Sequence, residues 1–354
     1  MSARWTLAAF ALIACPAAAQ ETEVPDAATL ADQFEYALVA GDYRVLDRTE
    51  DFAYFENGAQ LDPWDGMWRT TTALEGVDPA VFSGAFTLDY RVGIDQPDTT
   101  VRVIEVEENG VRGVMAYRLL SDGEGRIARI DVLPVREEFG GDRGGTITLL
   151  QPMLPFTMDA DHVVPIDPMG RPDRGPTADA TMRERIGAYL AGYAGGPQQD
   201  LAFTPGCQRF DNGQQATNVA DSDVLDPAHP AFRPYALGCE DQLESGYYAR
   251  FDPAEPVIYT DPARGLAIAF VRLDQPGTRL SFTTPGGMQV SYPGPRGAVE
   301  EADTSEQFDG RILTNMITPM SVNGAYVFSF DNDAIARIEA FYRGAPLGWD
   351  GVLD

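Results

Sequence analysis

Two stretches of the chain repeat apolar residues with the spacing of an amphipathic helix. In residues 27–40 the apolar positions include Leu30, Phe34 and Leu38, and residues 179–194 follow the same pattern. An apolar stripe of this kind packs against a sheet or another helix. We therefore predict one helix near the start of each half of the chain.

Alternation of apolar and polar residues, the period of a half-buried strand, follows each predicted helix. In the first half the alternating segments are 86–92, 100–107, 113–120 and 126–135. In the second half they are 266–273, 324–330 and 334–341. Turn-forming residues at 122–125 and 331–333 join the last two strands of each set. Helices followed by runs of strands predict an α+β fold.

Two short motifs occur twice, in the same order. The sequence Phe-Glu-Asn-Gly at 55–58 returns as Phe-Asp-Asn-Gly at 210–213, and Ile-Ala-Arg-Ile-Asp at 127–131 returns as Ile-Ala-Arg-Ile-Glu at 335–339. Asn-Gly fits a two-residue hairpin turn, because both central positions need positive φ. The repetition predicts a duplicated unit.

The length of the chain suits two domains of ordinary size. We place the boundary near residue 160, which gives a first domain over 24–160 and a second over 161–354. The second domain is longer because segments rich in Pro, Gly, Asp and Thr, read as loop insertions, occupy 217–238 and 274–322.

The first residues have the pattern of an export signal. Arg4 precedes an apolar run that ends at Cys15, and three alanines then precede Gln20. Small residues there predict a signal peptide over 1–19 and a periplasmic or secreted product. The alternative is a lipoprotein anchored through Cys15. The apolar run is too short for a stable membrane anchor, and we predict no integral membrane segment in the mature chain.

Charge excludes several classes of function. The net charge is −28, and all 26 basic residues are arginines. Nucleic acid is excluded as a partner, because phosphate binding needs clusters of basic residues. The absence of lysine excludes Schiff-base chemistry on a lysine amine.

Two cysteines, Cys207 and Cys239, remain after export, and in an oxidising compartment such a pair predicts a disulfide. The bridge would stabilise the fold by roughly 3 kcal/mol in the chain-entropy model. The only histidines, His162 and His229, fall in predicted loops. Two separated histidines and two disulfide-prone cysteines cannot form a compact ligand set, so we expect no metal site. The sequence also has no Gly-rich phosphate loop, and we expect no cofactor.

Further motifs carry a family resemblance. A Trp-containing segment at 66–70 follows the first Asn-Gly turn, a Gly-Cys segment at 238–243 follows the second, and the chain nears its end with Gly-Ala-Pro-Leu-Gly-Trp at 344–349. This order resembles the nuclear transport factor 2-like, or SnoaL-like, superfamily. More narrowly, it resembles a two-domain family of exported bacterial and fungal proteins of unknown function. The resemblance implies tandem cone-shaped domains, each a strongly curved antiparallel sheet packed on helices.

The superfamily includes cofactor-free isomerases, dehydratases, epoxide hydrolases, lyases and cyclases, as well as members that only bind or scaffold. Its enzymes place a carboxylate or histidine base in an apolar cone beside a proton donor, and such a base needs a raised pKa. The resemblance therefore implies that the chain handles a small, partly apolar molecule at the open mouth of a cone. A cofactor-independent acid/base lyase, isomerase or hydrolase and a non-catalytic binding or scaffold protein both remain open, as does the oligomeric state.

Strand alternation selects the candidate residues. Tyr54 and Glu56 share one face, and Arg209 and Asp211 share another; the latter pair could clamp a polar ligand group or simply form an ion pair. Asp131 and Glu339 point into the mouths if their face is concave and into solvent if it is convex. The catalytic candidates are Asp211, Glu339, Tyr54, Glu56 and Asp131. The ligand-binding candidates are Arg209, Trp68, Tyr247 and Tyr342, with core packing as the alternative for each aromatic residue.

Overall fold

The computed structural model describes residues 24–77, 90–136, 175–194, 201–218, 237–244, 251–277, 281–283, 289–291 and 319–349. The predicted signal peptide with Cys15, both histidines and Tyr247 lie outside these residues, as do most of the two predicted insertions. The proposed domain boundary near residue 160 also lies outside them and stays a prediction.

The described residues between 24 and 136 form a first unit, in which one helix packs on a seven-stranded sheet. The sheet order is β2-β1-β7-β6-β5-β3, and β4 also pairs with β5. The elements are α1 (Ala27–Ala40), the 3₁₀ turn η1 (Tyr43–Val45), β1 (Arg48–Glu56), β2 (Ala59–Leu61), α2 (Met67–Thr70), β3 (Thr71–Leu74), β4 (Arg91–Gln96), β5 (Thr99–Glu108), β6 (Val111–Ser121) and β7 (Ile127–Arg136).

The described residues between 175 and 349 form a second unit with the same plan. Its main sheet has the order β10-β12-β15-β16-β8-β9, and β11 also pairs with β12. The elements are α3 (Asp179–Tyr193), β8 (Phe203–Asp211), β9 (Gln214–Gln215), α4 (Cys239–Glu244), β10 (Asp252–Pro253), β11 (Val257–Asp261), β12 (Leu266–Gln275), β13 (Ser281–Thr283), β14 (Gln289–Ser291), β15 (Met320–Asp331) and β16 (Ala334–Pro346). The strands β13 and β14 form a separate small sheet.

The predicted α+β class, with two curved sheets packed on helices, is confirmed. One detail differs, because each sheet is mixed rather than wholly antiparallel. The strand β1 pairs in parallel with β7, and β8 pairs in parallel with β16. In each unit, these two strands are the first and the last along the sequence. Local alternation therefore carries no information about their relative direction.

Both predicted Asn-Gly hairpins form. Asn57 and Gly58 have φ of 50° and 75°, and Asn212 and Gly213 have φ of 49° and 83°. These left-handed backbone values are the ones that a tight hairpin turn needs, and Asn-Gly tolerates them best. The first turn follows the strand that carries Tyr54 and Glu56, and the second follows the strand that carries Arg209 and Asp211.

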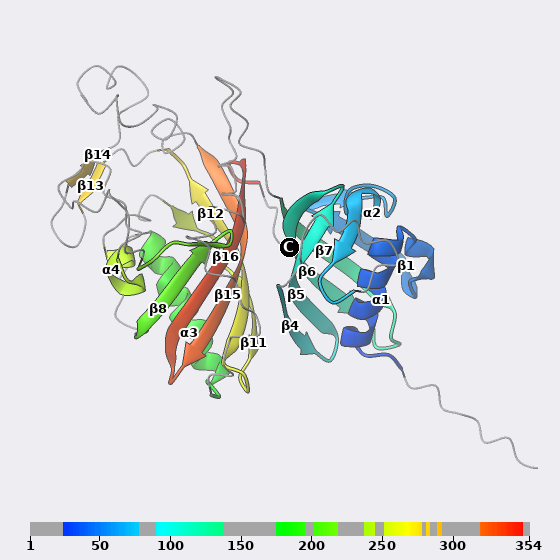
Figure 1. Ribbon diagram of the computed structural model, residues 1–354, viewed down its shortest axis with the longest axis horizontal. Helices are drawn as coiled ribbons and strands as arrows, with labels where there is room; N and C mark the ends of the chain where they lie inside the picture. Colours follow the sequence, from blue (N-terminus) through cyan, green and yellow to red (C-terminus); the bar gives the residue numbers. More distant parts are fainter. Residues whose placement is uncertain are drawn as a thin grey trace, which may run out of the picture.

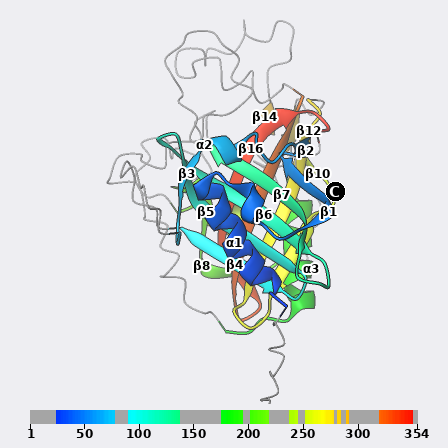
Figure 2. The same cartoon turned by 90° about the vertical axis from the view of Figure 1, so that its right-hand side faces the viewer.

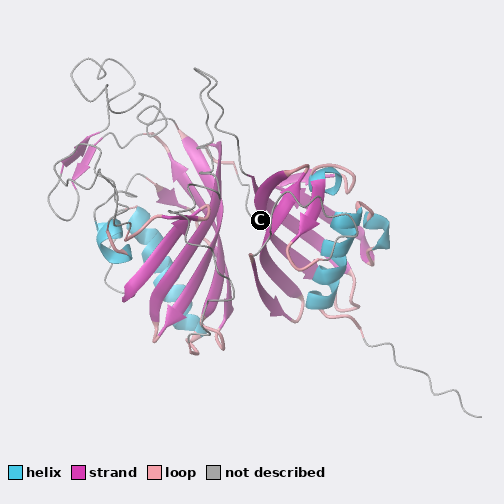
Figure 3. Cartoon of the chain, viewed as in Figure 1, coloured by secondary structure: helices cyan, strands magenta, loops and turns pink. Residues whose placement is uncertain are grey.

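The two sheets lie back to back, with α1 and α3 on the outer sides (Figures 1 and 3). The helix-facing sides enclose one apolar core per unit. The opposite sides pack on each other through a third buried cluster, to which both units contribute; it includes Val101, Val103, Ile268, Val327 and Phe341. Figure 2, turned by 90°, shows the strands of one sheet behind those of the other. Each sheet is therefore buried on both faces.

Candidate functional site

A buried carboxylate contacts a tyrosine on the helix-facing side of the first unit. The Tyr54 hydroxyl donates a hydrogen bond of 2.6 Å to Oε1 of Glu56, and the Met67 backbone N–H donates one of 2.5 Å to the same oxygen. Strand β1 places both side chains on this face, as alternation predicts, and α2 supplies the backbone donor. Glu56 is 7% exposed and Tyr54 is 1% exposed.

Burial determines the proton affinity of this pair. Desolvation raises the pKa of Glu56, although the hydrogen bonds from Tyr54 and Met67 partly oppose it. Burial and the neighbouring Glu56 raise the pKa of Tyr54 well above its usual value, so this phenol stays protonated at neutral pH. A carboxyl with a raised pKa beside a protonated hydroxyl is an arrangement that suits general acid–base chemistry.

Trp68 lies next to this pair and brings an unused donor. Its ring makes edge contacts with Tyr54, at a centroid distance of 5.9 Å, and with Phe34, at 5.7 Å. The side chain is 5% exposed, and its Nε1–H meets no hydrogen-bond acceptor in the described part of the chain. A buried donor left without a partner costs about 1–3 kcal/mol.

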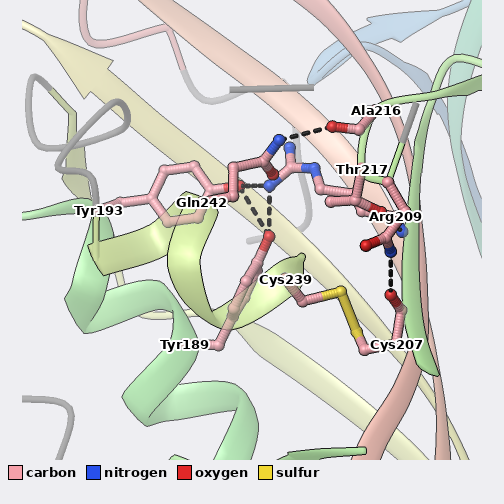
Figure 4. Close-up of a disulfide and its surroundings, with 9 residues drawn as sticks. Tyr189, Tyr193, Cys207, Arg209, Ala216, Thr217, Cys239 and Gln242 are labelled. Atoms are coloured by element: carbon pink, nitrogen blue, oxygen red, sulfur yellow. Dashed lines mark hydrogen bonds between the residues drawn. A yellow bond between two sulfur atoms is a disulfide. The ribbon is translucent and has the colours of Figure 1, made fainter. Parts of the chain in front are cut away.

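The second unit has a different polar cluster on its helix-facing side, shown in Figure 4. Nη1 of Arg209 donates to the hydroxyls of both Tyr189 and Tyr193, and Nε donates to Oδ1 of Asp211 at 2.7 Å. Arg209 is 2% exposed, whereas the Asp211 side chain is 14% exposed. The cluster thus reaches solvent at its carboxylate end.

The predicted disulfide lies beside this cluster. Cys207 of β8 is bonded to Cys239 of α4, with an S–S distance of 2.03 Å (Figure 4). Gln242, one turn further along α4, donates to the Ala216 carbonyl at 2.5 Å. The disulfide therefore holds α4 against β8, the strand that carries Arg209, and Gln242 holds α4 against the residue that follows β9.

The sequence patterns selected Arg209 and Asp211 as candidates but did not select Tyr189, Tyr193 or Tyr326. Tyr326 belongs to the same core, next to Phe328. A signal was present, because a buried tyrosine hydroxyl needs a partner, and three tyrosines facing one core imply a polar centre.

Asp131 and Glu339 lie neither in the mouth of a cone nor in solvent, the two environments that the sequence left open. Both lie on the face turned away from the helices, yet they are only 5% and 1% exposed, because the other sheet covers them. Asp131 pairs with Arg118 and Arg129, both at 2.7 Å. Glu339 pairs with Arg337 at 2.6 Å and accepts a hydrogen bond from Tyr90 of the first unit.

This face explains the second repeated motif. The guanidinium of Arg129 lies 4.3 Å from the Phe55 ring centre, and that of Arg337 lies 4.3 Å from the Phe210 ring centre. Each arginine also pairs with the acid two residues later. The motif therefore builds the same cation–π contact and ion pair in both units.

The remaining candidates are less informative. Tyr342 is partly buried against the core of the second unit, and its backbone exchanges two hydrogen bonds with the Asn212 side chain. Tyr247 lies outside the described residues. Among the residues that the structure describes, no group of three or more His, Cys, Asp or Glu side chains could hold a metal ion. In the same residues, none of the helices combines the length and apolarity needed to cross a bilayer.

Residues 176–342 match the model of a protein family described as a domain of unknown function, DUF8021. The match covers the second unit and a little under half of the chain. No curated protein matches the sequence. Among solved structures, the complex of Mtr2 with the Mex67 M domain from C. albicans matches at 13% identity, covering 46% of this chain and 93% of that one, with a TM-score of 0.22. The structural match is weak, and it says nothing about what this chain binds.

Proposed function

We propose that the chain handles a small, partly apolar molecule on the helix-facing side of its first unit, with Glu56 and Tyr54 as an acid–base pair. A carbonyl oxygen of the molecule accepts a hydrogen bond from Nε1 of Trp68. Glu56 exchanges a proton with the adjacent carbon, and the reaction class is that of a cofactor-independent lyase, isomerase or hydrolase.

The unused indole N–H beside the buried pair is the observation that carries this proposal. Trp68 packs edge-on against Tyr54, whose hydroxyl already contacts Glu56. An acceptor brought to Nε1 would remove the cost of the unpaired donor. It would also lie next to a carboxyl whose pKa is raised by burial, which makes that carboxylate a stronger base once ionised.

A non-catalytic binding or scaffold role remains the second candidate, and one contact favours it. A Cβ on Gly66 would overlap the Glu56 carboxyl group, so this carboxyl packs directly on the backbone that starts α2. Glu56 could therefore serve only to hold α2 against β1. In that case the unit would bind a molecule through Trp68 without changing it.

Export to the periplasm or outside the cell remains part of this proposal. The Cys207–Cys239 disulfide supports it, because such bridges persist in oxidising compartments. Descent from the nuclear transport factor 2-like superfamily likewise stays a proposal, supported by the duplicated order of elements.

Acetophenone, a small aromatic ketone, is a suitable probe because it combines an apolar ring, a carbonyl acceptor and exchangeable methyl protons. In protein labelled with ¹⁵N at its tryptophans, we expect the probe to shift the Trp68 indole N–H signal, which Trp68→Phe identifies. The chain has only four tryptophans, so the spectrum is simple. Trp68→Phe should weaken binding by about 2- to 10-fold, the worth of one hydrogen bond, whereas Trp64→Phe, at an exposed position, should not.

The same probe separates the two candidates. Loss of the methyl proton signal in D₂O reports proton abstraction next to the carbonyl. If Glu56 is the base, the protein accelerates this loss and Glu56→Gln abolishes the acceleration while binding persists. Binding without accelerated exchange would leave the non-catalytic role, and an unshifted Trp68 signal would remove the site.

A further inference from the structure

The second unit has a tyrosine hydroxyl that makes no hydrogen bond to the described residues, at a position where the first unit has a satisfied one. On the first sheet, Tyr117 pairs with Val132, which pairs with Glu56. On the second sheet, Tyr326 pairs with Ala340, which pairs with Asp211. The two tyrosines therefore hold equivalent places, each separated by one intervening strand from the repeated acidic position.

The surroundings of these two tyrosines differ. The Tyr117 hydroxyl donates to Glu35 at 2.5 Å, and Glu35 also pairs with Arg102, the residue opposite Tyr117 on β5. The residue opposite Tyr326 on β12 is Ala269, which has no polar side chain. Tyr326 is 1% exposed, and its hydroxyl makes no hydrogen bond within the described residues.

Tyr326 lies in the same buried core as Tyr189 and Tyr193, the two tyrosines that contact Arg209. Burial raises the pKa of Tyr326 well above its usual value, and Tyr189, Tyr193, Arg209 and Asp211 all act on it. Burial likewise raises the pKa of Tyr189, so these phenols remain hydrogen-bond donors at neutral pH. Among the described residues, the centre combines a guanidinium with three tyrosine hydroxyls and one carboxylate, that of Asp211.

Such a centre is rich in donors and suits a ligand with acceptor oxygens. Guanidinium and hydroxyl groups bind carboxylates strongly, because hydrogen bonds to an ionised acceptor are about twice as strong as neutral ones. Asp211 already accepts from Nε of Arg209, which shows that the cluster accommodates a carboxylate. The aromatic residues around it, including Phe328 and Phe251, offer apolar contact to the rest of a ligand.

We propose that the second unit holds a separate binding site for a small organic acid with an apolar body, whose carboxylate accepts hydrogen bonds from Tyr326 and the Arg209 cluster. The site is distinct from the one proposed around Trp68, which lies in the other unit and takes a carbonyl compound. The two units thus share a fold but differ in ligand polarity.

The proposal is tested with benzoate, and with benzamide as a neutral analogue of the same shape, by ligand-detected NMR titration of the full mature chain at constant ionic strength. We expect benzoate to bind and benzamide to bind at least tenfold more weakly. Tyr326→Phe removes only the unpaired hydroxyl and should lower benzoate affinity on the order of tenfold. Its matched control, Tyr117→Phe in the first unit, should leave benzoate affinity unchanged.

Asp211→Asn gives a test in the opposite direction. It removes a negative charge beside the proposed carboxylate, so benzoate affinity should rise several-fold while benzamide binding stays constant. Trp68→Phe should not affect benzoate, so failure of the first-unit site and failure of this one can be told apart. Absence of benzoate binding, equal binding of benzamide, or benzoate affinity unchanged by both Tyr326→Phe and Asp211→Asn would overturn the proposal.

Discussion

Glu56 shows how one buried side chain makes stability depend on pH. Its pKa is raised in the folded chain, mainly because burial removes water from the carboxylate. As pH rises, the unfolded chain releases this proton first, so the contribution of Glu56 to stability is complete below its unfolded pKa. That contribution is lost as pH rises through the folded-state pKa. We therefore expect Glu56→Gln, which stays neutral, to gain stability relative to the natural chain as pH increases from 4 to 8.

Urea unfolding of both proteins over this range measures the difference, and Glu184→Gln, at an exposed position on α3, is the control. Equal pH slopes for natural chain and Glu56→Gln would show that the carboxyl is not destabilised by burial.

The sequence predicted which side chains share a face of their sheet, but not what those side chains contact. Alternation correctly grouped Tyr54 with Glu56 and Arg209 with Asp211. It could not show that the face of Asp131 and Glu339 is covered by a second sheet, because that depends on contacts between distant parts of the chain. The donor without an acceptor at Trp68 was equally invisible, since a missing partner leaves no trace in the sequence.

At the scale of elements, each unit has a short helix that is linked to the strand carrying its candidate site residues. The link is a hydrogen bond in the first unit and a disulfide in the second. In the first unit, β1 is tied to α2 by the hydrogen bond from the Met67 N–H to Glu56. In the second unit, the Cys207–Cys239 disulfide ties β8 to α4. Cys207→Ala combined with Cys239→Ala should cost about 3 kcal/mol in the chain-entropy model. Because the chain has two units, the sharper measurement is hydrogen exchange, in which α4 and β8 should lose protection while α2 and β1 keep theirs. Unchanged protection of α4 would mean that Gln242 and apolar packing suffice to hold it.

The elements themselves were largely readable from the sequence. The helices at 27–40 and 179–194, the Asn-Gly turns and most of the long strands appear within a few residues of their predicted ends, because each is specified by local periodicity and turn chemistry. The strand predicted over 86–92 is an exception, since β4 is Arg91–Gln96. The parallel pairings of β1 with β7 and of β8 with β16 were missed. The short strand β3 was missed as well, since four residues are too few to show an alternation.

At the scale of the whole molecule, the duplicated units depend on each other. Each sheet presents an apolar face to the other, and polar contacts cross the same boundary, including Tyr90 to Glu339 and the Trp349 indole N–H to the Asn57 carbonyl at 2.7 Å. A curved sheet packed on a helix needs only one buried face. Each unit needs the other to bury the second face of its sheet. We therefore expect the two units to be more stable together than either unit is alone.

Val327→Arg tests this dependence, because it places a charge without a partner at a position only 1% exposed between the sheets. An unpaired buried charge costs several kcal/mol, so the sheets should separate. We expect the radius of gyration in small-angle scattering to increase, and one calorimetric unfolding transition to become two as the units uncouple.

Val101→Arg, which alters the same interface from the first unit, should have the same effect. The control is Val45→Arg, at a position 58% exposed, which should change neither measurement. If both interface variants keep the natural size and a single transition, the sheets are held together by something other than this apolar cluster.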